Sequence, residues 1–419
     1  MSEFYNIKGT HDLLPEELKI WQRVETQIHQ IMQQYGYGEI RTPAFENTEL
    51  FVRGIGTDTD IVNKEMYSWV DQGGNSLTLK PELTAPVVRA YIQHQMGKQN
   101  PIHRLYYLDI LFRRERPQKG RQRQFYQFGA EAIGSPNPEQ DAEIIAMAYH
   151  IYQNFGIQEM EVRLNSIGSE EIRPVYLELL RNILDKYRGE LCKTCETRLK
   201  KNALRIFDCK NPSCQEMLNA KAPYIFDSIS IADHQHFDSV TRMLNEMNIP
   251  FNHDKKLVRG LDYYSHTTFE IISSVLGAQN ALCGGGRYNG LIEQLGGRST
   301  PAVGFAAGVE RLILALDKIE NIESAQNIYF ITLGEESTVK ACQLVFKIRT
   351  ECGKTVILDT LRRSLKAQMR DANRCGVKTV VILGEEELQK HIVIVKDMVT
   401  SDQLEVPISD IVNYFSNNP

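Results

Sequence analysis

Charged side chains crowd into the segment 113–123, which holds six cations and a single carboxylate. Arginine outnumbers lysine there, and a planar guanidinium suits two-point recognition of a phosphate group. Glu115 lies inside the run as an acceptor, and Phe125 follows closely with a ring that could stack on a purine. A solvated basic turn is the alternative, but these three details favour a phosphate or nucleotide site.

Arg259 stands between apolar residues in the segment 257–264, which ends in Tyr263 and Tyr264. Burying a guanidinium is costly unless it meets an anion. The segment therefore predicts either an anion site with two hydroxyls beside it or an edge strand with a surface arginine. The residues alone leave these two interpretations equally open.

Two further segments are rich in small residues. Three glycines at 284–286 precede Arg287 and Tyr288, and they would let a ligand approach the backbone closely, although a tight turn explains the same pattern. The segment 303–316 predicts a helix entered through small residues. That helix would either bring Arg311 to a ligand surface or carry it on the outside of the core, and spacing alone favours the second.

Glu82 and Thr84 lie two residues apart in the segment 81–86. In an extended chain they would point to the same side, where both could accept hydrogen bonds from one ammonium group. The start of a helix explains the same residues, and both interpretations can hold together.

Apolar periodicity indicates the elements that must position these residues. It predicts helices over 15–35 and 138–155 and strands over 39–43, 105–112, 124–132, 267–272 and 280–283. The strands 105–112 and 124–132 flank the charged loop, so that loop is expected to join a hairpin. After residue 328, short apolar runs alternate with helical patterns, which indicates a small α/β domain with mostly parallel pairing.

In chain order, these segments resemble the three motifs of class II aminoacyl-tRNA synthetases. The helix and strand that end at Pro43 resemble motif 1, the hairpin with residues 112–115 resembles motif 2, and the segment 304–311 resembles motif 3. Three segments of the chain resemble segments specific to histidyl-tRNA synthetases, namely residues 5–12, 257–264 and 284–288. The resemblance covers almost the whole chain.

The resemblance implies an α+β catalytic domain built on an antiparallel sheet of the class II synthetase type, with a helical insertion. A C-terminal α/β anticodon-binding domain would follow it. The expected bounds are 1–322 for the catalytic domain, 170–253 for its insertion, 323–327 for a linker and 328–419 for the anticodon-binding domain.

For ATP, the resemblance implies Arg113 on the α-phosphate, Glu115 on the adenine and Phe125 stacked against the adenine ring. Arg121 and Arg311 would grip the β- and γ-phosphates. Mg²⁺ would accompany the nucleotide.

For histidine, the resemblance implies a pocket of Glu82, Thr84, Gln127, Glu131, Arg259, Tyr263, Tyr264 and Tyr288. The first three would lie at the α-ammonium end. Glu131 and Tyr264 would read the two imidazole nitrogens, and the other two tyrosines would complete the pocket. A substrate that lacks either ring nitrogen would leave a buried polar group unpaired, and such sites reject strongly.

The reaction implied needs no protein nucleophile, because the histidine carboxylate attacks the α-phosphorus in line and pyrophosphate leaves. Positioning and neutralisation of growing negative charge then supply the catalysis. Arg259 and Arg113, on opposite sides of the α-phosphate, would be the catalytic residues. Histidine would pass from the adenylate to the 3′ end of tRNA(His).

The resemblance also implies a homodimer, and the lack of a membrane helix or signal peptide indicates the cytoplasm. In the C-terminal domain, tRNA would meet a cationic face of Arg362, Arg363, Lys366, Arg370 and Arg374, although an ordinary helix surface is the alternative. The net charge of −5 argues against a protein that binds nucleic acid non-specifically over its whole surface. No run of apolar residues is long enough for a membrane helix, and the N-terminus does not resemble a signal peptide.

Four of the eight cysteines, Cys192, Cys195, Cys209 and Cys214, fall close together inside the expected insertion. Their spacing and ligand type suit a closed structural zinc site. Four reduced thiols are the alternative, and the family resemblance does not require a metal at this place. The two interpretations stay open.

Three other functions compete with the synthetase. A regulatory subunit of ATP phosphoribosyltransferase resembles a synthetase that has lost the anticodon-binding domain and has eroded histidine motifs, whereas this chain keeps Arg259 and the C-terminal domain. A synthetase for proline or threonine would lack the segments around Arg259 and Gly285. A purely RNA-binding protein would leave the nucleotide motifs unexplained.

Overall fold

The computed structural model describes residues 4–57, 59–118, 120–276, 280–316 and 328–417. The chain divides into two compact units, residues 1–319 and residues 320–419. The predicted linker, 323–327, lies outside the described residues. Among the described residues, none of the helices combines the length and the apolar character that crossing a bilayer requires.

The first unit is built on an eight-stranded sheet. Its strands, in sheet order, are β1 (Gly38–Glu39), β5 (His103–Phe112), β6 (Gln124–Ile133), β11 (Ala302–Gly308), β10 (Ala281–Arg287), β9 (Ser265–Ser273), β7 (Met160–Ser166) and β8 (Phe251–His253). The pairs from β5 through to β7 are antiparallel, whereas the outer strands β1 and β8 each pair in parallel. The predicted antiparallel sheet is confirmed.

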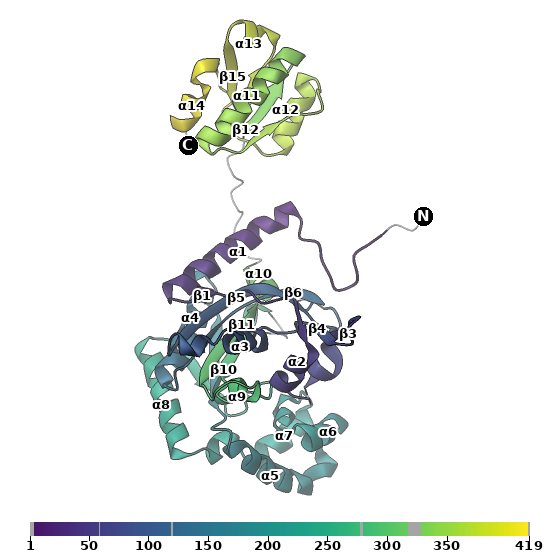
Figure 1. Ribbon diagram of the computed structural model, residues 1–419, viewed down its shortest axis with the longest axis vertical. Coiled ribbons are helices and arrows are strands. Elements are labelled where there is room, and N and C mark those ends of the chain that lie inside the picture. Colours follow the sequence, from purple (N-terminus) through teal and green to yellow (C-terminus); the bar gives the residue numbers. More distant parts are fainter. Residues whose placement is uncertain (1–3, 58, 119, 277–279, 317–327, 418–419) are drawn as a thin grey trace. The chain divides into compact units, whose positions relative to one another are not determined.

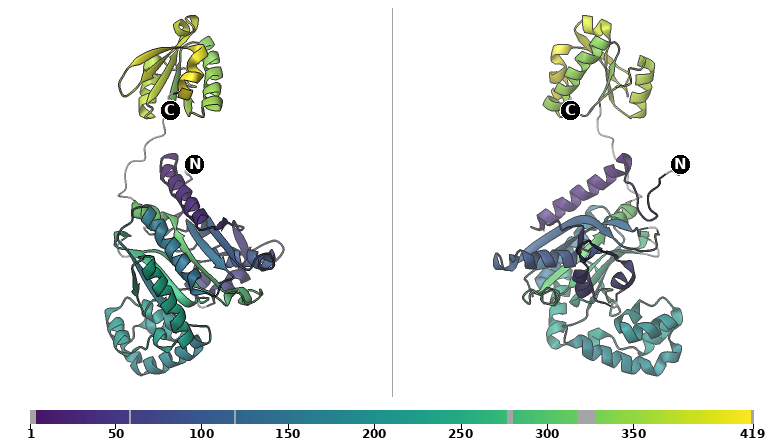
Figure 2. Two further views of the ribbon diagram at one scale, coloured as in Figure 1. Left: turned by 90° about the vertical axis from the view of Figure 1, so that its left-hand side faces the viewer. Right: turned by 45° about the vertical axis from the view of Figure 1, so that its right-hand side comes forward.

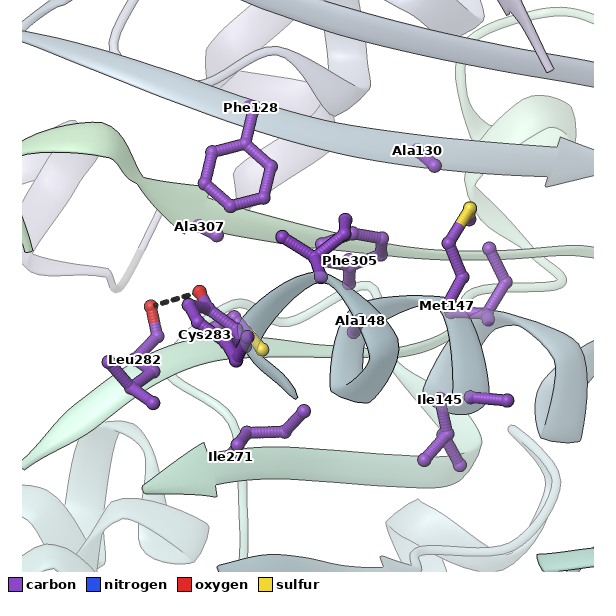
Figure 3. Packing of buried hydrophobic residues seen from close by; sticks show 14 of the residues in the cluster. Phe128, Ala130, Ile145, Met147, Ala148, Ile271, Leu282, Cys283, Phe305 and Ala307 are labelled. Atoms are coloured by element: carbon purple, nitrogen blue, oxygen red, sulfur yellow. Dashed lines mark hydrogen bonds between the residues drawn. The ribbon is translucent and has the colours of Figure 1, made fainter. Parts of the chain in front are cut away.

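Helices cover one face of this sheet. α1 (Pro15–Gln34), α4 (Pro138–Asn154), α8 (Ile231–Glu246) and α10 (Val309–Leu316) bury their apolar sides against it. α4 and α8 lie side by side along the sheet (Figures 1 and 2). Phe128 of β6 and Phe305 of β11 point toward Ala148 of α4 and form part of this core (Figure 3).

The prediction of one helix over 303–316 is wrong in its first half, because residues 302–308 form the central strand β11. Val303, Phe305 and Ala307 belong to the core under the helices, while Gly304 and Ala306 face the opposite side. That alternation has the period of a strand. The small residues are needed because a Cβ at position 304 would lie 1.7 Å from a carboxylate oxygen of Glu131.

The glycines 284–286 likewise form no turn, since they lie inside strand β10. The strand expected over 39–43 is shorter than predicted, with only Gly38–Glu39 paired to β5. A small second sheet stands next in the chain, with the order β2 (Phe45–Asn47), β4 (Ser76–Leu79) and β3 (Tyr67–Val70). α2 (Thr48–Ile55), the π-helical turn η1 (Ile61–Glu65) and α3 (Thr84–Gln93) complete this part.

The predicted helical insertion contains short helices packed on one another. They are α5 (Ile172–Leu184), η3 (Asp185–Glu190), α6 (Lys193–Lys201), η4 (Ala203–Asp208), α7 (Pro212–Lys221) and η5 (Ile225–Ser228). α8 and β8 follow within the predicted bounds but pack into the main core and the main sheet. Their packing therefore places the end of the predicted insertion in the main body of the unit.

The second unit has a five-stranded sheet with helices. In sheet order its strands are β13 (Val356–Leu358), β12 (Ile328–Thr332), β14 (Thr379–Leu383), β15 (Ile392–Asp397) and β16 (Gln403–Pro407). The first three are parallel and the last two pairs antiparallel. Its helices are α11 (Glu335–Cys352), α12 (Leu365–Arg374), α13 (Glu385–Gln389) and α14 (Ile411–Asn417).

Candidate active site

A cavity of about 750 Å³ lies on the sheet face that the four core helices leave open. Every residue predicted to bind ATP or histidine lines it: Glu82, Thr84, Arg113, Glu115, Arg121, Phe125, Gln127, Glu131, Arg259, Tyr263, Tyr264, Tyr288 and Arg311. The structure thus brings together segments that are far apart in the sequence. The role of each residue stays a prediction.

Strand β6 supplies two of these residues because its side chains alternate between the two faces. Gln127 and Glu131 point into the cavity, while Phe128 and Ala130 lie in the core. Gly129 leaves room on the cavity side, where a Cβ would lie 2.6 Å from the Tyr107 hydroxyl.

Glu131 is fully buried and accepts hydrogen bonds from three hydroxyl groups. Tyr288 donates to Oε2 at 2.6 Å, and Thr84 and Tyr107 donate to Oε1 at 2.8 and 3.1 Å. Burial raises the pKa of Glu131 to about 7, against the opposing effect of these hydrogen bonds. This carboxyl is therefore poised between its two protonation states near neutral pH, with neutral donors around it.

Aromatic rings form the wall beside Glu131. Tyr263 packs edge-on against Tyr288 at a centroid distance of 5.7 Å, and its ring is tilted against that of Tyr264 at 4.7 Å. All three tyrosines are buried. The pocket next to the Glu131 carboxyl thus offers flat apolar surfaces and phenol hydroxyls, which suits a small aromatic ring that carries polar atoms.

Glu82 lies just before helix α3 and also lines the cavity, so the predicted helix start is confirmed and the ammonium contact stays a prediction. Its carboxylate accepts hydrogen bonds from the backbone N–H of Thr84 at 2.8 Å and of Ala85 at 3.0 Å. Burial raises the pKa of Glu82 above its usual range despite these bonds. The Thr84 hydroxyl donates a hydrogen bond to Glu131.

Arg259 crosses over strand β10 at Gly284. A Cβ on Gly284 would lie 2.2 Å from a guanidinium nitrogen, so only glycine leaves this space. One arginine Nη1 donates to Glu270 Oε1 at 3.1 Å. The alternative of an edge strand with a surface arginine at 257–264 is therefore wrong, because Arg259 is mostly enclosed within the cavity wall.

The charged loop brings Arg113, Glu115 and Arg121 to the cavity. Arg113 donates through Nε to the Pro81 carbonyl at 2.8 Å, and its guanidinium carbon lies 5.2 Å from the centre of the Phe125 ring. Arg121 contacts the Glu115 carboxylate at 3.1 Å. Arginines and an aromatic ring therefore meet at one surface, as a nucleotide site requires.

Arg311 and its neighbour Glu310 lie at the start of α10. Arg311 donates through Nη1 to the Ala281 carbonyl at 2.7 Å. Glu310 accepts from the Tyr126 N–H at 2.8 Å, and burial raises the pKa of Glu310 to about 7. The expectation that Arg311 lies outside the core on a helix surface is wrong, since both side chains line the cavity.

Some buried polar atoms in the cavity wall have no hydrogen-bond partner within the described part of the chain, among them Oε1 of Gln127 and Nε of Arg259. A buried polar atom left unpaired costs about 1–3 kcal/mol. An acceptor and a donor are thus available to a ligand.

The sequence did not reveal several residues that line the cavity or hold its side chains. Tyr107 binds Glu131, Glu270 pairs with Arg259, and Arg205 and Phe207 of the insertion line the wall. Tyr107 could have been found from strand alternation, since it faces the same side as Glu131 in the β5–β6 hairpin. Arg205 and Phe207 carry no such signal, because they come from a separate helical segment.

The remaining predicted sites lie elsewhere. The four clustered cysteines converge within the insertion and do not line the cavity. On the predicted cationic face of the second unit, Arg363 contacts Asp359 at 2.8 Å and Asp371 at 2.7 Å. Part of that charge is therefore neutralised, and the face stays a prediction.

Comparison with known proteins gives the family. The sequence model of the family described as histidyl-tRNA synthetase matches residues 9–312, and that of the anticodon binding domain matches residues 327–418. The chain is 46% identical over 415 residues to a histidine–tRNA ligase of Geobacillus thermodenitrificans, covering 97% of this chain and 96% of the relative.

The chain belongs to the histidyl-tRNA synthetase family. As a member of this family it is an aminoacyl-tRNA synthetase, a ligase that uses ATP. The predicted class II fold with a C-terminal anticodon-binding domain is confirmed.

Solved structures agree with this family. A histidyl-tRNA synthetase of S. aureus, without ligands, is 38% identical, and the match has a TM-score of 0.84 over 99% of this chain and 100% of that chain. A Bacillus halodurans structure titled an ATP phosphoribosyltransferase regulatory subunit/histidyl-tRNA synthetase is only 23% identical, with a TM-score of 0.65 and coverage of 92% and 99%. At that identity the second likeness shows the shared fold alone.

Proposed function

We propose that this synthetase activates L-histidine with ATP in the cavity on the open face of the sheet, and then transfers histidine to the 3′ end of tRNA(His). The observation that carries the proposal is the buried Glu131 carboxyl, ringed by hydroxyls and tyrosine rings. An imidazole needs one acceptor and one donor in a flat pocket. Glu131 supplies the acceptor, and the Tyr264 hydroxyl supplies the partner of the other ring nitrogen.

The opposite end of the amino acid would meet polar groups at the start of α3. The Glu82 carboxylate, the Thr84 hydroxyl and Gln127 Oε1 are acceptors for the α-ammonium group, and the last lacks a protein partner among the described residues. Tyr263 and Tyr288 pack around the imidazole and hold its plane. The substrate carboxylate then faces the arginines.

ATP would lie across the charged loop. Arg113 holds the α-phosphate, Glu115 contacts the adenine, and Phe125 stacks on the adenine ring, so Arg113 must leave part of the Phe125 ring to the base. Arg121 and Arg311 hold the β- and γ-phosphates. These residues bind the nucleotide with the leaving group directed away from histidine.

Catalysis is assigned to Arg259 and Arg113. With the histidine carboxylate in line with the α-phosphorus, the two guanidinium groups neutralise the charge that grows on the α-phosphate oxygens. Glu270 holds Arg259 in place through the 3.1 Å contact. Pyrophosphate leaves without a covalent enzyme intermediate.

The site also suits Mg²⁺ by its donor set, because Glu270 and Glu310 bring carboxylate oxygens to the cavity wall. When bound, Mg²⁺ neutralises charge on the phosphates of ATP. The residues of this chain position those phosphates through Arg121 and Arg311.

The functional unit is expected to be a homodimer in the cytoplasm. Apolar side chains are exposed on the small sheet, among them Phe45, Trp69 and Val70. Sedimentation equilibrium of the purified chain would give twice the chain mass if the dimer forms. A monomer at micromolar concentration would contradict this part of the proposal.

The central test is ATP–pyrophosphate exchange with each of the twenty amino acids, for the parent and for Arg259→Ala. Histidine alone should support exchange, and the variant should lose about 10²–10³-fold in kcat/KM because one charge-stabilising donor is removed. Arg298→Ala, at an exposed position outside the cavity, serves as the control. Exchange driven by an amino acid other than histidine, or an Arg259→Ala variant as active as the parent, would overturn the assignment of this cavity and of Arg259.

A further inference from the structure

The four cysteines of the insertion meet at one point, although they come from three separate segments. Cys192 and Cys195 lie at the start of α6, Cys209 follows η4, and Cys214 lies in the first turn of α7. Their four sulfur atoms all lie within 4.8 Å of one another. Cys192 Sγ and Cys209 Sγ are 3.9 Å apart.

This spacing is that of ligands around a single metal ion. Four thiolates at about 2.3 Å from a tetrahedral zinc ion stand about 3.8 Å from one another. A disulfide bond would need about 2.05 Å between two sulfur atoms. We propose that Cys192, Cys195, Cys209 and Cys214 bind one structural Zn²⁺ that holds the insertion against the wall of the active site.

The surroundings of the sulfur atoms fit a closed thiolate site. Two backbone N–H groups point at sulfur, from Cys192 to Cys214 Sγ at 3.1 Å and from Asn211 to Cys209 Sγ at 3.4 Å. Such donors orient ligating thiolates from outside the coordination shell. Three of the four cysteines are buried, and Cys192 is partly exposed. A site with four protein ligands leaves no position open for substrate, so its role is structural.

The other four cysteines show that this convergence is not how the chain places thiols in general. Cys283 is buried in the core of the main sheet, while in the second unit Cys352 is partly exposed and Cys342 and Cys375 are exposed. Among the described residues, the four cysteines of the insertion are the one group of three or more side chains placed to hold a metal ion together. Four thiols serving only as small core residues would have no reason to meet with their sulfur atoms facing one another.

The segment between Cys195 and Cys209 explains what the metal would do. It carries Arg205 and Phe207 into the cavity wall, and Arg205 Nη1 contacts Asp60 Oδ2 at 2.7 Å. Asn202 donates to Asp262 Oδ1 at 2.9 Å, next to the tyrosines of the histidine pocket. A metal that fixes both ends of this segment fixes the insertion to the site.

The first experiment measures metal in the full-length chain, purified without added metal and without chelators. Elemental analysis should find about one zinc per chain, and zinc should be released in step with modification of the thiols by an organomercurial. Chains refolded or exchanged with Co²⁺ should show the absorption of a tetrahedral tetrathiolate complex. Substoichiometric metal with the four insertion thiols freely reactive would overturn the proposal, as would two disulfides in the freshly purified chain or iron in place of zinc.

Variants locate the site. Cys209→Ser and Cys214→Ser should lose the bound zinc and lower the thermal midpoint, while Cys342→Ser, an exposed control in the second unit, should keep both unchanged. Zinc retained at the parent level in both site variants would overturn the assignment of the ligands. The metal content of the parent decides the question even if a variant fails to fold.

The consequence for the active site rests on the proposed function. Loss of zinc should raise KM for histidine more than it lowers kcat in pyrophosphate exchange, because the wall residues loosen while the catalytic arginines stay. An equal kcat and KM for zinc-free and zinc-loaded chains would overturn the positioning role. The metal and spectral measurements do not depend on activity, so a failure of the proposed active-site assignment would be recognised separately.

Discussion

Two fully buried carboxyl groups on opposite faces of one sheet behave in opposite ways. Glu131 lies in the cavity with hydroxyl donors, and burial raises the pKa of Glu131 to about 7. Asp141 of α4 lies under the sheet against Arg287, whose Nε donates to it at 3.1 Å. Burial also pushes the pKa of Asp141 upward, but hydrogen bonds from His236 and the charge and hydrogen bonds of Arg287 outweigh it and hold that pKa below its ordinary value.

The difference shows how one sheet separates structure from function. Asp141 has its cation built in, so its charge is permanent and its geometry is closed. Glu131 is held by neutral groups and keeps capacity for a further donor, which a ligand can supply. A buried carboxyl whose partners are all neutral is therefore a better indicator of a binding site than one inside an ion pair.

The largest expected effect comes from Glu131→Gln. The amide keeps the size of the side chain but removes the charge that accepts from the imidazole, so kcat/KM for histidine should fall about a thousandfold in pyrophosphate exchange. The thermal midpoint should not fall, because the substitution removes a carboxyl group whose burial is unfavourable in the charged form. If the variant kept activity within tenfold of the parent, Glu131 would have a structural role like that of Asp141 and no role in binding histidine.

Asp141→Asn should act on stability instead. It leaves the Arg287 charge buried without its partner, so the free energy of unfolding should fall by about 3–5 kcal/mol in a denaturant titration. The activity per folded molecule should change far less than in Glu131→Gln. The double variant Asp141→Leu/Arg287→Met should recover much of the lost stability. If Asp141→Asn kept the stability of the parent but lost as much activity as Glu131→Gln, the contrast between the two carboxyl groups would be wrong.

Tyr288→Phe should have the smallest effect and test the titration of Glu131. Since the raised pKa means that the carboxylate is lost as pH falls through about 7, kcat/KM for histidine should decline below that pH in the parent. The Tyr288 hydroxyl stabilises the carboxylate, so its removal should move the decline to higher pH.

The control for this shift is Tyr176→Phe, which removes a buried hydroxyl that donates to Pro223 at 2.7 Å in the insertion. The titration of free histidine affects both variants equally, so only the difference between their pH profiles reports on Glu131. An identical pH profile for the two variants would show that Tyr288 does not act on this carboxyl.

Many helices and strands could be predicted because their formation depends on residues close together in the sequence. Helices α1 and α4 and strands β5 and β6 follow from periodicity within a few residues of their observed bounds. Strand β11 was misread because its small residues match a helix entrance as well as a strand held tightly between two others. A helix entrance and a central strand of this kind differ in the strands that lie beside them. Those strands come from distant parts of the sequence, so a short window does not contain the information.

The site was predictable in its members but not in its contacts. The resemblance to a family gave the residues that line the cavity, whereas the fit of Arg259 over Gly284 and the ring of hydroxyls on Glu131 depend on strand register across distant segments. The residues that the sequence missed, such as Arg205, come from a helical segment whose position is fixed by tertiary contacts alone.

Strand β10 has a consequence for attempts to redesign the specificity of this synthetase. Gly284 leaves the space under Arg259, and Tyr288, one residue beyond the end of the strand, holds Glu131. A library that varies this strand to accept a different amino acid would also disturb the arginine assigned to catalysis. Productive routes to a new substrate should therefore begin from Tyr263 and Tyr264, on the separate segment that precedes β9, where side chains can change while β10 keeps its register.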